Sequence, residues 1–262
     1  MCKECGCGLG GGHARIEGSG HDHDHHHGHE HHHGHSHAPG NRTLDLNRSL
    51  MEKNDRLAEQ NRRLFRSKKL LVLNVVSSPG SGKTAFIRET AVLLDGRLRV
   101  AVIVGDLATD NDAARLRDAG VAAVQIRTGT VCHLDAGMVF NAASQLDLDK
   151  FDLLIIENVG NLVCPADYDL GEDLRVVLLS VTEGEDKPLK YPPMFHSAAA
   201  AIVTKNDLAK AVDFDRGQAL ANLKRISHHA KIFEVSAKTG EGMNAWVEFL
   251  IQQHATASVA ER

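Results

Sequence analysis

The sequence lacks a surplus of positive charge and lacks a long hydrophobic run. Lys and Arg total 30 against 34 Asp and Glu in 262 residues, giving a net charge of −4, which does not favour binding to nucleic-acid phosphates. The apolar runs, such as Leu70–Leu73 and Leu153–Ile156, are too short to cross a bilayer. No apolar stretch typical of a secretory signal follows the first charged residues. We therefore expect a cytoplasmic protein that binds neither nucleic acid nor membrane.

Histidine and cysteine are frequent but unevenly placed. Of the 17 histidines, 12 precede residue 40, and three of the five cysteines (Cys2, Cys5 and Cys7) stand near the first residue. The other two, Cys132 and Cys164, lie far downstream. An odd number of cysteines in a reducing compartment does not favour a disulfide framework. Thiolates and imidazoles gathered in this way indicate metal binding.

The chain divides into three segments of different composition. Residues 1–40 hold almost no apolar side chains, which predicts a disordered Cys/His-rich metal-binding tail. Residues 41–69 repeat leucine every seven positions among charged residues, which predicts an amphipathic linker helix. Its leucines are expected to pack on the body of the protein, and the alternative is that they pack on a partner. Those leucines are Leu50, Leu57 and Leu64. Residues 70–262 form the expected nucleotide-binding domain.

Short apolar runs alternate with helical stretches from residue 70 onward. The expected strands are Leu70–Val76, Val100–Val104, Ala122–Ile126, Leu153–Glu157, Arg175–Val181, Ala200–Thr204 and Ile232–Val235. Apolar strands separated by helices are typical of an α/β fold, in which a mainly parallel sheet carries helices on both faces.

A phosphate-binding loop follows the first expected strand. Residues 77–84 read S-S-P-G-S-G-K-T, which departs from the pattern G-x-x-x-x-G-K-[ST] only at Ser77. The glycines let successive backbone N–H groups point at phosphate oxygens, while Lys83 reaches the β- and γ-phosphates and Thr84 binds Mg²⁺. The residues expected to bind phosphate are Gly80, Ser81, Gly82, Lys83 and Thr84. The sequence thus predicts the phosphate-loop NTPase fold, and the alternative is an ordinary Gly/Ser-rich turn.

Two later motifs, T-K-N-D at 204–207 and S-A-K at 236–238, are typical of guanine recognition. The Asp207 carboxylate can accept hydrogen bonds from guanine N1–H and the 2-amino group, which adenine does not offer. The stem of Lys205 can cover the base, and the Ala237 N–H can bond guanine O6. These motifs favour GTP over ATP. The expected base-site residues are Lys205, Asp207, Ser236, Ala237 and Lys238.

The run E-N-V-G, from Glu157 to Gly160, follows the fourth expected strand where many GTPases carry D-x-x-G. The Glu157 carboxylate is expected near Mg²⁺ and the Gly160 N–H near the γ-phosphate. Asp106 is a second carboxylate candidate, for Mg²⁺ or for positioning water, and Asp110 and Asp112 compete for that role. No glutamine stands out as a water-orienting residue, so we expect slow intrinsic hydrolysis that depends on electrostatics and positioning.

Cys132, His133 and Cys164 are candidate metal ligands within the globular domain. Two thiols and an imidazole suit Zn²⁺ or Ni²⁺ better than Mg²⁺. The sequence alone does not show that they converge, and the alternative is two buried structural cysteines with a surface histidine. Cys164 closely follows the expected γ-phosphate sensor Gly160, so metal and nucleotide could influence each other.

The tail offers two further candidate sites. The motif C-x-x-C-G-C places Cys2, Cys5 and Cys7 close enough to wrap one metal ion. The histidine tract is a weaker, multi-ligand site that suits metal buffering, and its alternatives are an expression tag or a pH-responsive linker. Its candidate ligands are His21, His23, His25, His26, His27, His29, His31, His32, His33, His35 and His37.

These motifs together resemble the hydrogenase nickel-incorporation GTPases of the HypB family. The resemblance rests on C-x-x-C-G-C, the histidine tract, S-S-P-G-S-G-K-T, the Cys132-His133 pair, E-N-V-G-N-L-V-C-P and S-V-T-E-G-E-D-K-P, and it spans essentially the whole chain. It implies a dimerising GTPase that delivers Ni²⁺ to the large-subunit precursor of [NiFe]-hydrogenase. It also implies that Cys132, His133 and Cys164 are interface metal ligands and that the three tail cysteines bind nickel.

The resemblance further implies a HypA-type zinc/nickel accessory protein and a SlyD-type nickel-binding prolyl isomerase as partners. Other functions stay open at this point. The related urease accessory GTPases lack the C-x-x-C-G-C start and carry a different metal motif. A nickel store or sensor with nucleotide-controlled oligomeric state, or a signalling GTPase with an unrelated metal-binding tail, would carry the same phosphate loop.

Overall fold

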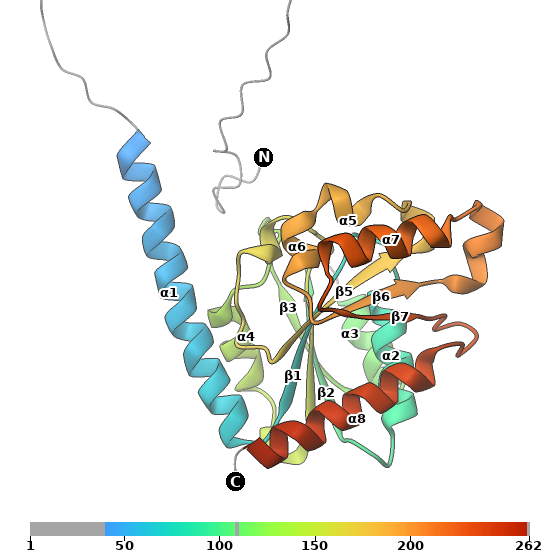
Figure 1. Ribbon diagram of the computed structural model, residues 1–262. Helices are drawn as coiled ribbons and strands as arrows, with labels where there is room; N and C mark the ends of the chain where they lie inside the picture. Colours follow the sequence, from blue (N-terminus) through green and yellow to red (C-terminus); the bar gives the residue numbers. More distant parts are fainter. Residues whose placement is uncertain (1–39, 108–109, 261–262) are drawn as a thin grey trace, which may run out of the picture.

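The computed structural model describes residues 40–107 and 110–260 (Figure 1). The expected tail, with its cysteine and histidine ligands between Cys2 and His37, lies outside the described residues. No described helix is both long enough and apolar enough to cross a membrane.

Seven parallel strands form one sheet in the order β3-β2-β4-β1-β5-β6-β7. The strands are β1 (Leu71–Val76), β2 (Val100–Asp106), β3 (Ala122–Arg127), β4 (Leu153–Glu157), β5 (Leu174–Ser180), β6 (Ala200–Thr204) and β7 (Lys231–Glu234). Each expected strand is present, and the predicted α/β fold with a mainly parallel sheet is confirmed. The central strands read as continuous apolar runs because both faces of the sheet are covered.

Helices cover the two faces of the sheet. The helices are α1 (Gly40–Ser67), α2 (Lys83–Leu94), α3 (Asn111–Asp118), α4 (Ala136–Ala143), α5 (Lys187–Lys190), α6 (Pro192–His196), α7 (Arg216–Ile226) and α8 (Met243–Ala260). Four short 3₁₀ segments are η1 (Leu148–Lys150), η2 (Cys164–Ala166), η3 (Val181–Glu183) and η4 (Asn206–Val212). Side chains of α2, α3 and α8 share a core with one face, and those of α1, α4, α6 and α7 pack on the other.

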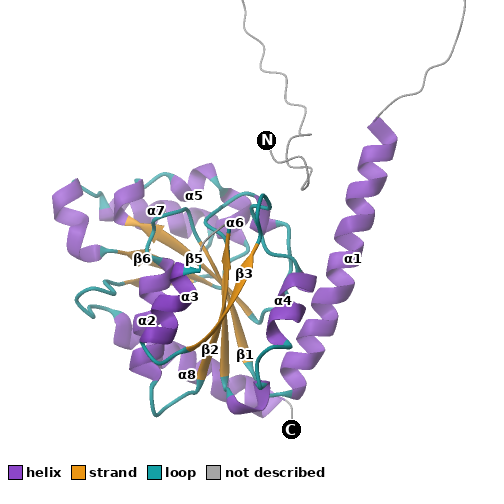
Figure 2. Cartoon of the chain, turned by 180° about the vertical axis from the view of Figure 1, so that it is seen from behind, coloured by secondary structure: helices purple, strands orange, loops and turns teal. Residues whose placement is uncertain are grey.

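Helix α1 lies beside α4 in both views (Figures 1 and 2). Its buried face carries Ala58 and Phe65 together with two asparagines, Asn54 and Asn61. Asn54 Oδ1 accepts from the Ala136 N–H at 2.9 Å, and Asn61 Nδ2 donates to the Ala136 carbonyl at 2.8 Å. These bonds fix α1 to the start of α4.

The expected packing of the leucine stripe on the body of the protein is wrong for its first member. Leu50 is 48% exposed, whereas Leu57 and Leu64 are half-buried. The three leucines lie to one side of the buried face of α1. The hydrogen bonds of Asn54 and Asn61, and not the leucines alone, set the rotation of α1 about its own axis.

Candidate functional site

The phosphate loop connects the end of β1 to the first turn of α2. Gly80 and Gly82 have φ of 73° and 96°, in the left-handed region that glycine adopts without strain. Gly82 is the N-cap of α2, directly before its first residue Lys83, so the positive end of the helix dipole faces the loop. Ser81 is buried, and its hydroxyl donates to the Ser78 carbonyl at 3.0 Å. The loop is therefore shaped to hold an anion.

Two buried charged residues, Lys83 and Glu157, lie at this loop together with the half-buried Thr84. Thr84 Oγ1 donates to Glu157 Oε1 at 2.7 Å, and Lys83 Nζ donates to Ser77 Oγ at 2.9 Å. Burial lowers the pKa of Lys83, and the Glu157 charge opposes that shift. Burial raises the pKa of Glu157 to about 7, although the Thr84 bond and Lys83 act against the rise. A cation placed here would restore the ionised carboxylate.

Glu157 Oε2 is buried and has no hydrogen-bond partner among the described residues. Asp106 ends β2 and Asp112 lies in the first turn of α3, and the charges of both act on Lys83 and Glu157. This set of carboxylate and hydroxyl oxygens, with Thr84, suits a hard cation such as Mg²⁺. The chemistry of these donors fits the predicted Mg²⁺ position. Asp112 and Asp106 are equal candidates for the second carboxylate ligand.

Gly160 touches the phosphate loop directly. A Cβ atom at Gly160 would lie 2.9 Å from Pro79 Cα, so a side chain there would displace the loop backbone. The segment that follows β4 therefore packs on the phosphate loop through this glycine. That contact suits the expected role of the Gly160 N–H near a γ-phosphate.

A pocket of about 250 Å³ lies beside the loop, where both guanine motifs meet. Lys205 Nζ donates to the Gly80 carbonyl at 2.7 Å, and its stem lies over Gly82, whose added Cβ would be 3.6 Å from Lys205 Cε. Asp207, Ala237 and Lys238 also line the pocket. The structure therefore brings four of the five predicted base-site residues to one pocket, and Ser236 lies behind them in contact with Asp207.

Ser236 has a more specific place than the sequence indicated. Its buried hydroxyl donates to Asp207 Oδ1 at 2.6 Å and accepts from the Thr239 N–H at 3.2 Å. Ser236 therefore orients the Asp207 carboxylate.

Cys132, His133 and Cys164 converge. Their ligand atoms all lie within 4.8 Å of one another, and the two sulfur atoms are 2.9 Å apart. Cys132 and His133 lie in the loop between β3 and α4, and Cys164 begins η2. Among the described residues no other group of three His, Cys, Asp or Glu side chains has its ligand atoms this close.

His133 is held in the form that binds metal. Its ring is 4% exposed and stacks on Tyr168 with centroids 3.8 Å apart. Burial lowers the pKa of His133, so the neutral imidazole is favoured, and its buried Nδ1 has no hydrogen-bond partner within the described part of the chain. Two thiols and a neutral imidazole fit a borderline ion such as Ni²⁺ or Zn²⁺.

Asn158 joins the loop that carries Cys132 and His133 to β1, and sequence reasoning missed this role. Asn158 Oδ1 accepts from the Leu134 N–H at 3.3 Å, next to His133, while its Nδ2 donates to Asn74 Oδ1 of β1 at 3.2 Å. Asn161 Nδ2 donates to the Cys132 carbonyl at 3.1 Å. The position of Asn158 directly after Glu157, at the end of a buried strand, was the available signal.

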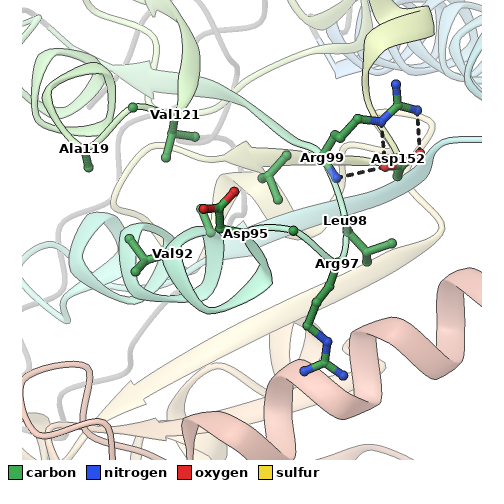
Figure 3. A pocket seen from close by; sticks show the side chains of 12 residues that line it. Val92, Asp95, Arg97, Leu98, Arg99, Ala119, Val121 and Asp152 are labelled. Atoms are coloured by element: carbon green, nitrogen blue, oxygen red, sulfur yellow. Dashed lines mark hydrogen bonds and ion pairs between the residues drawn. The ribbon is translucent and has the colours of Figure 1, made fainter.

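A larger cavity, of about 650 Å³, lies at the opposite edge of the sheet (Figure 3). Its lining includes Arg99, whose guanidinium makes two hydrogen bonds to the Asp152 carboxylate at 2.9 and 2.7 Å. The charged groups of this pair are satisfied by each other, and no predicted site residue lines the cavity. We therefore place the candidate site at the phosphate-loop edge.

Comparison with known proteins agrees with this geometry. The sequence profile of the family described as "CobW/HypB/UreG, nucleotide-binding domain" matches residues 71–234. The hydrogenase maturation factor HypB of Azotobacter vinelandii is 51% identical over 222 residues, covering 84% of this chain and 73% of the relative. HypB of Escherichia coli K12 is 50% identical over 219 residues, covering 82% and 76%. The chain belongs to the HypB family.

Solved HypB structures share the fold. A crystal structure of HypB from Helicobacter pylori in complex with nickel is 43% identical, has a TM-score of 0.75, and is matched over 78% of this chain and 96% of that one. HypB from Archaeoglobus fulgidus is 40% identical with a TM-score of 0.73, over 78% and 99%. Membership in the HypB family makes the chain a hydrogenase maturation factor with a phosphate-loop nucleotide-binding domain.

Proposed function

We propose that this chain is a GTP-hydrolysing nickel metallochaperone that delivers or gates Ni²⁺ insertion into the large subunit of [NiFe]-hydrogenase. The observation that carries the proposal is the short segment from Glu157 to Cys164. It begins in the charged group at the phosphate loop, contacts that loop through Gly160, and ends at a metal-ligand cluster. One segment therefore belongs to both sites.

GTP is the proposed nucleotide because the Asp207 carboxylate, oriented by Ser236, would accept hydrogen bonds from guanine N1–H and the 2-amino group. Gly80, Ser81 and Gly82 would hold the phosphates through backbone N–H groups, and Lys83 would neutralise the β- and γ-oxygens. Thr84 and Glu157, with Asp106 or Asp112, would hold Mg²⁺, which supplies charge neutralisation of the phosphates. Gly160 would donate its N–H to the γ-phosphate.

Hydrolysis would be slow. Lys83 positions and neutralises the transferring phosphoryl group, and the carboxylate of Asp106 would orient the attacking water or hold the cation. The deeply buried Lys83 ammonium is a fixed positive charge in a site of low dielectric constant, where it stabilises developing negative charge more than it would in water.

Nickel is proposed as cargo at Cys132, His133 and Cys164, with Zn²⁺ as a competing occupant. Three protein ligands leave a fourth coordination position open for exchange or for a second protein. Val163, next to Cys164, is 57% exposed, so this side of the cluster faces the surface. A GTP-dependent homodimer that joins two such surfaces would bring two copies of the ligand set together.

The remaining roles concern the segment 1–40 and the partners. The tail, through Cys2, Cys5, Cys7 and the histidine tract, would store nickel, with the helix at 41–69 as linker and 70–262 as GTPase domain. A HypA-type accessory protein and the hydrogenase large-subunit precursor would accept the metal, and a SlyD-type prolyl isomerase would supply it. The protein would act in the cytoplasm.

Complementation of a host lacking its own copy of this factor tests the proposal. Lys83→Ala and Cys164→Ala should each abolish hydrogenase activity even at high nickel, whereas removal of residues 1–39 should abolish it only when nickel is scarce. Lys224→Ala, at an exposed position of α7, is the matched control and should restore activity. Rescue of Lys83→Ala by added nickel would contradict a required GTPase.

A further inference from the structure

Three of the five histidines that follow residue 40 gather at one place on the surface. His196 ends α6, and His228 and His229 lie in the turn between α7 and β7. All three are exposed. The ring centroids of His228 and His229 are 5.3 Å apart, those of His196 and His229 are 5.5 Å apart, and those of His196 and His228 are 6.4 Å apart.

This histidine cluster, His196–His228–His229, is separate from the site described above. It lies where β6 and β7 begin, beside the neighbouring helices α6 and α7 (Figure 1). Because every strand is parallel, that end of the sheet is opposite to the edge where the phosphate loop and the Cys132 loop lie. The cluster therefore has no part in the nucleotide or cysteine sites.

The spacing of the rings is close to that of imidazoles that share one ion. At a metal–nitrogen distance of about 2.0–2.1 Å, two bound imidazoles have centroids roughly 4.5 Å apart when adjacent and about 6.4 Å apart when opposite. The separations of His229 from the other two rings lie inside that interval, and the 6.4 Å between His196 and His228 must shorten for all three rings to bind one ion. The nitrogens do not yet converge within 4.8 Å, as those of the Cys132 group do. Binding of one ion therefore requires the exposed His228 and His229 rings to turn about their side-chain torsions toward His196.

The His196 ring is already oriented by a hydrogen bond to the backbone. His196 Nδ1 lies 3.2 Å from the Ile226 carbonyl oxygen. A carbonyl only accepts, so Nδ1 carries the proton and the Nε2 lone pair is left for a ligand. Histidines that bind metal usually donate their other N–H to a carbonyl or carboxylate in this way, which fixes the tautomer and strengthens the ligand.

We propose that His196, His228 and His229 bind one borderline divalent transition-metal ion, of the class of Ni²⁺ and Zn²⁺. Imidazole is the ligand type that suits these ions.

Site-resolved footprinting tests this in the full-length chain with Ni²⁺ as the probe. Free Ni²⁺ is set by a metal buffer, histidines are carbethoxylated with diethyl pyrocarbonate, and each peptide is quantified by mass spectrometry, so the tail is read separately. His196, His228 and His229 should become protected at one common Ni²⁺ concentration. His229→Ala should raise the concentration that protects His196 by at least about tenfold, because a shared ion loses a ligand.

His254→Ala is the control, since His254 lies in α8 and outside the cluster. It should leave the protection of His196 unchanged. His229 is exposed and His254 is half-buried, so both variants should fold, and far-ultraviolet circular dichroism checks this. No protection of the cluster, or protection of His196 that is the same in His229→Ala as in the unsubstituted chain, would overturn the shared site.

Discussion

The two edges of the sheet differ in how their charged and polar side chains are partnered. At the edge where the strands end, Glu157 Oε2 and His133 Nδ1 are buried without a hydrogen-bond partner among the described residues. At the edge where β2 begins, Arg99 and Asp152 make a two-pronged ion pair, and Arg97 bonds Glu248 at 2.6 Å. One edge leaves buried groups for ligands, and the other satisfies its charges internally.

This difference shows why cavity size alone misplaces the site. The larger cavity lies at the internally satisfied edge, whereas the smaller pocket holds Asp207 and adjoins the phosphate loop. An unpartnered buried polar atom costs about 1–3 kcal/mol, which a bound ligand can offset. Substitutions at the phosphate-loop edge should therefore change activity. Substitutions at the edge with Arg99 and Asp152 should change only the stability of the fold.

The largest effect should come from Lys83→Ala. Removal of this buried ammonium takes away the charge that neutralises the γ-phosphate, and we expect GTP turnover to fall by about 10²–10³-fold. Single-turnover hydrolysis by purified protein measures it. Lys224→Ala should hydrolyse GTP at the unsubstituted rate, and near-normal turnover by Lys83→Ala would remove the functional distinction between the two edges.

A smaller effect should follow from Asp207→Asn. The amide presents a donor to guanine N1–H or its amino group, so GTP affinity should fall roughly ten- to a hundredfold, about 1.4–2.8 kcal/mol. Xanthine nucleotides, with a carbonyl in place of the amine, should bind the variant better than they bind the unsubstituted chain. Titration with fluorescent nucleotides measures both affinities.

Asp213→Asn is the matched control for that substitution. Asp213 follows η4 with φ of 51°, a conformation that asparagine also adopts, and it does not line the base pocket. Its GTP affinity should be unchanged. If Asp207→Asn behaved like Asp213→Asn, the pocket would not be a guanine site.

The smallest effect should come from Asp152→Asn at the internally satisfied edge. The hydrogen bonds from Arg99 hold the pKa of Asp152 below its usual value, so the ionised carboxylate stabilises the folded state. Because Arg99 is 60% exposed, we expect a loss of only about 0.2–1 kcal/mol of unfolding free energy at neutral pH. GTP affinity should not change.

The sign of its pH dependence is fixed by the lowered pKa. The contribution is fully present above the unfolded-state pKa of 3.8 and is lost as the pH falls through the lower folded-state value. Urea unfolding at several pH values should therefore show the two proteins converging in acid. If the difference in unfolding free energy between the two proteins grew toward low pH, the Arg99–Asp152 ion pair would not be its cause.

Much of the fold was predictable because its signals are local. Strands such as Leu153–Glu157 are continuous apolar runs, and the loop around Gly80 and Gly82 follows from its own glycines. The sequence also predicted Cys132, His133 and Cys164 as ligands from their chemistry, while their convergence depended on the order of strands in the sheet. Their occupation by a metal, like the roles of the nucleotide residues, stays a prediction.

The features that sequence reasoning missed depend on tertiary partners. Asn54 and Asn61 are buried in α1 because they bond the backbone at Ala136, which is distant in sequence. The Tyr168 ring stacks on His133. Asn158 makes hydrogen bonds both to β1 and to the loop that carries Cys132 and His133. Polar residues of this kind look like ordinary loop or helix-surface residues until their partners are placed.

The proposed function requires that the nucleotide and the Cys132–His133–Cys164 cluster are coupled. Coupling is measurable in the full-length chain when Cys2, Cys5 and Cys7 are replaced by Ser, since Cys132 and Cys164 are then the remaining cysteines. The thiolate-to-nickel charge-transfer absorption then reports this site despite the histidine tract. Adding Cys164→Ala to the same background should diminish the band and serves as its control.

The decisive measurement is the Ni²⁺ affinity of that triple-Ser protein, titrated with buffered free Ni²⁺ in GDP and in a non-hydrolysable GTP analogue. We expect the Ni²⁺ affinities in the two nucleotide states to differ by a factor of roughly 5–150. By linkage, Ni²⁺ should change the affinity for the GTP analogue relative to that for GDP by the same factor. Equal Ni²⁺ affinities in both nucleotide states, with Cys164→Ala diminishing the band, would contradict nucleotide-gated nickel transfer.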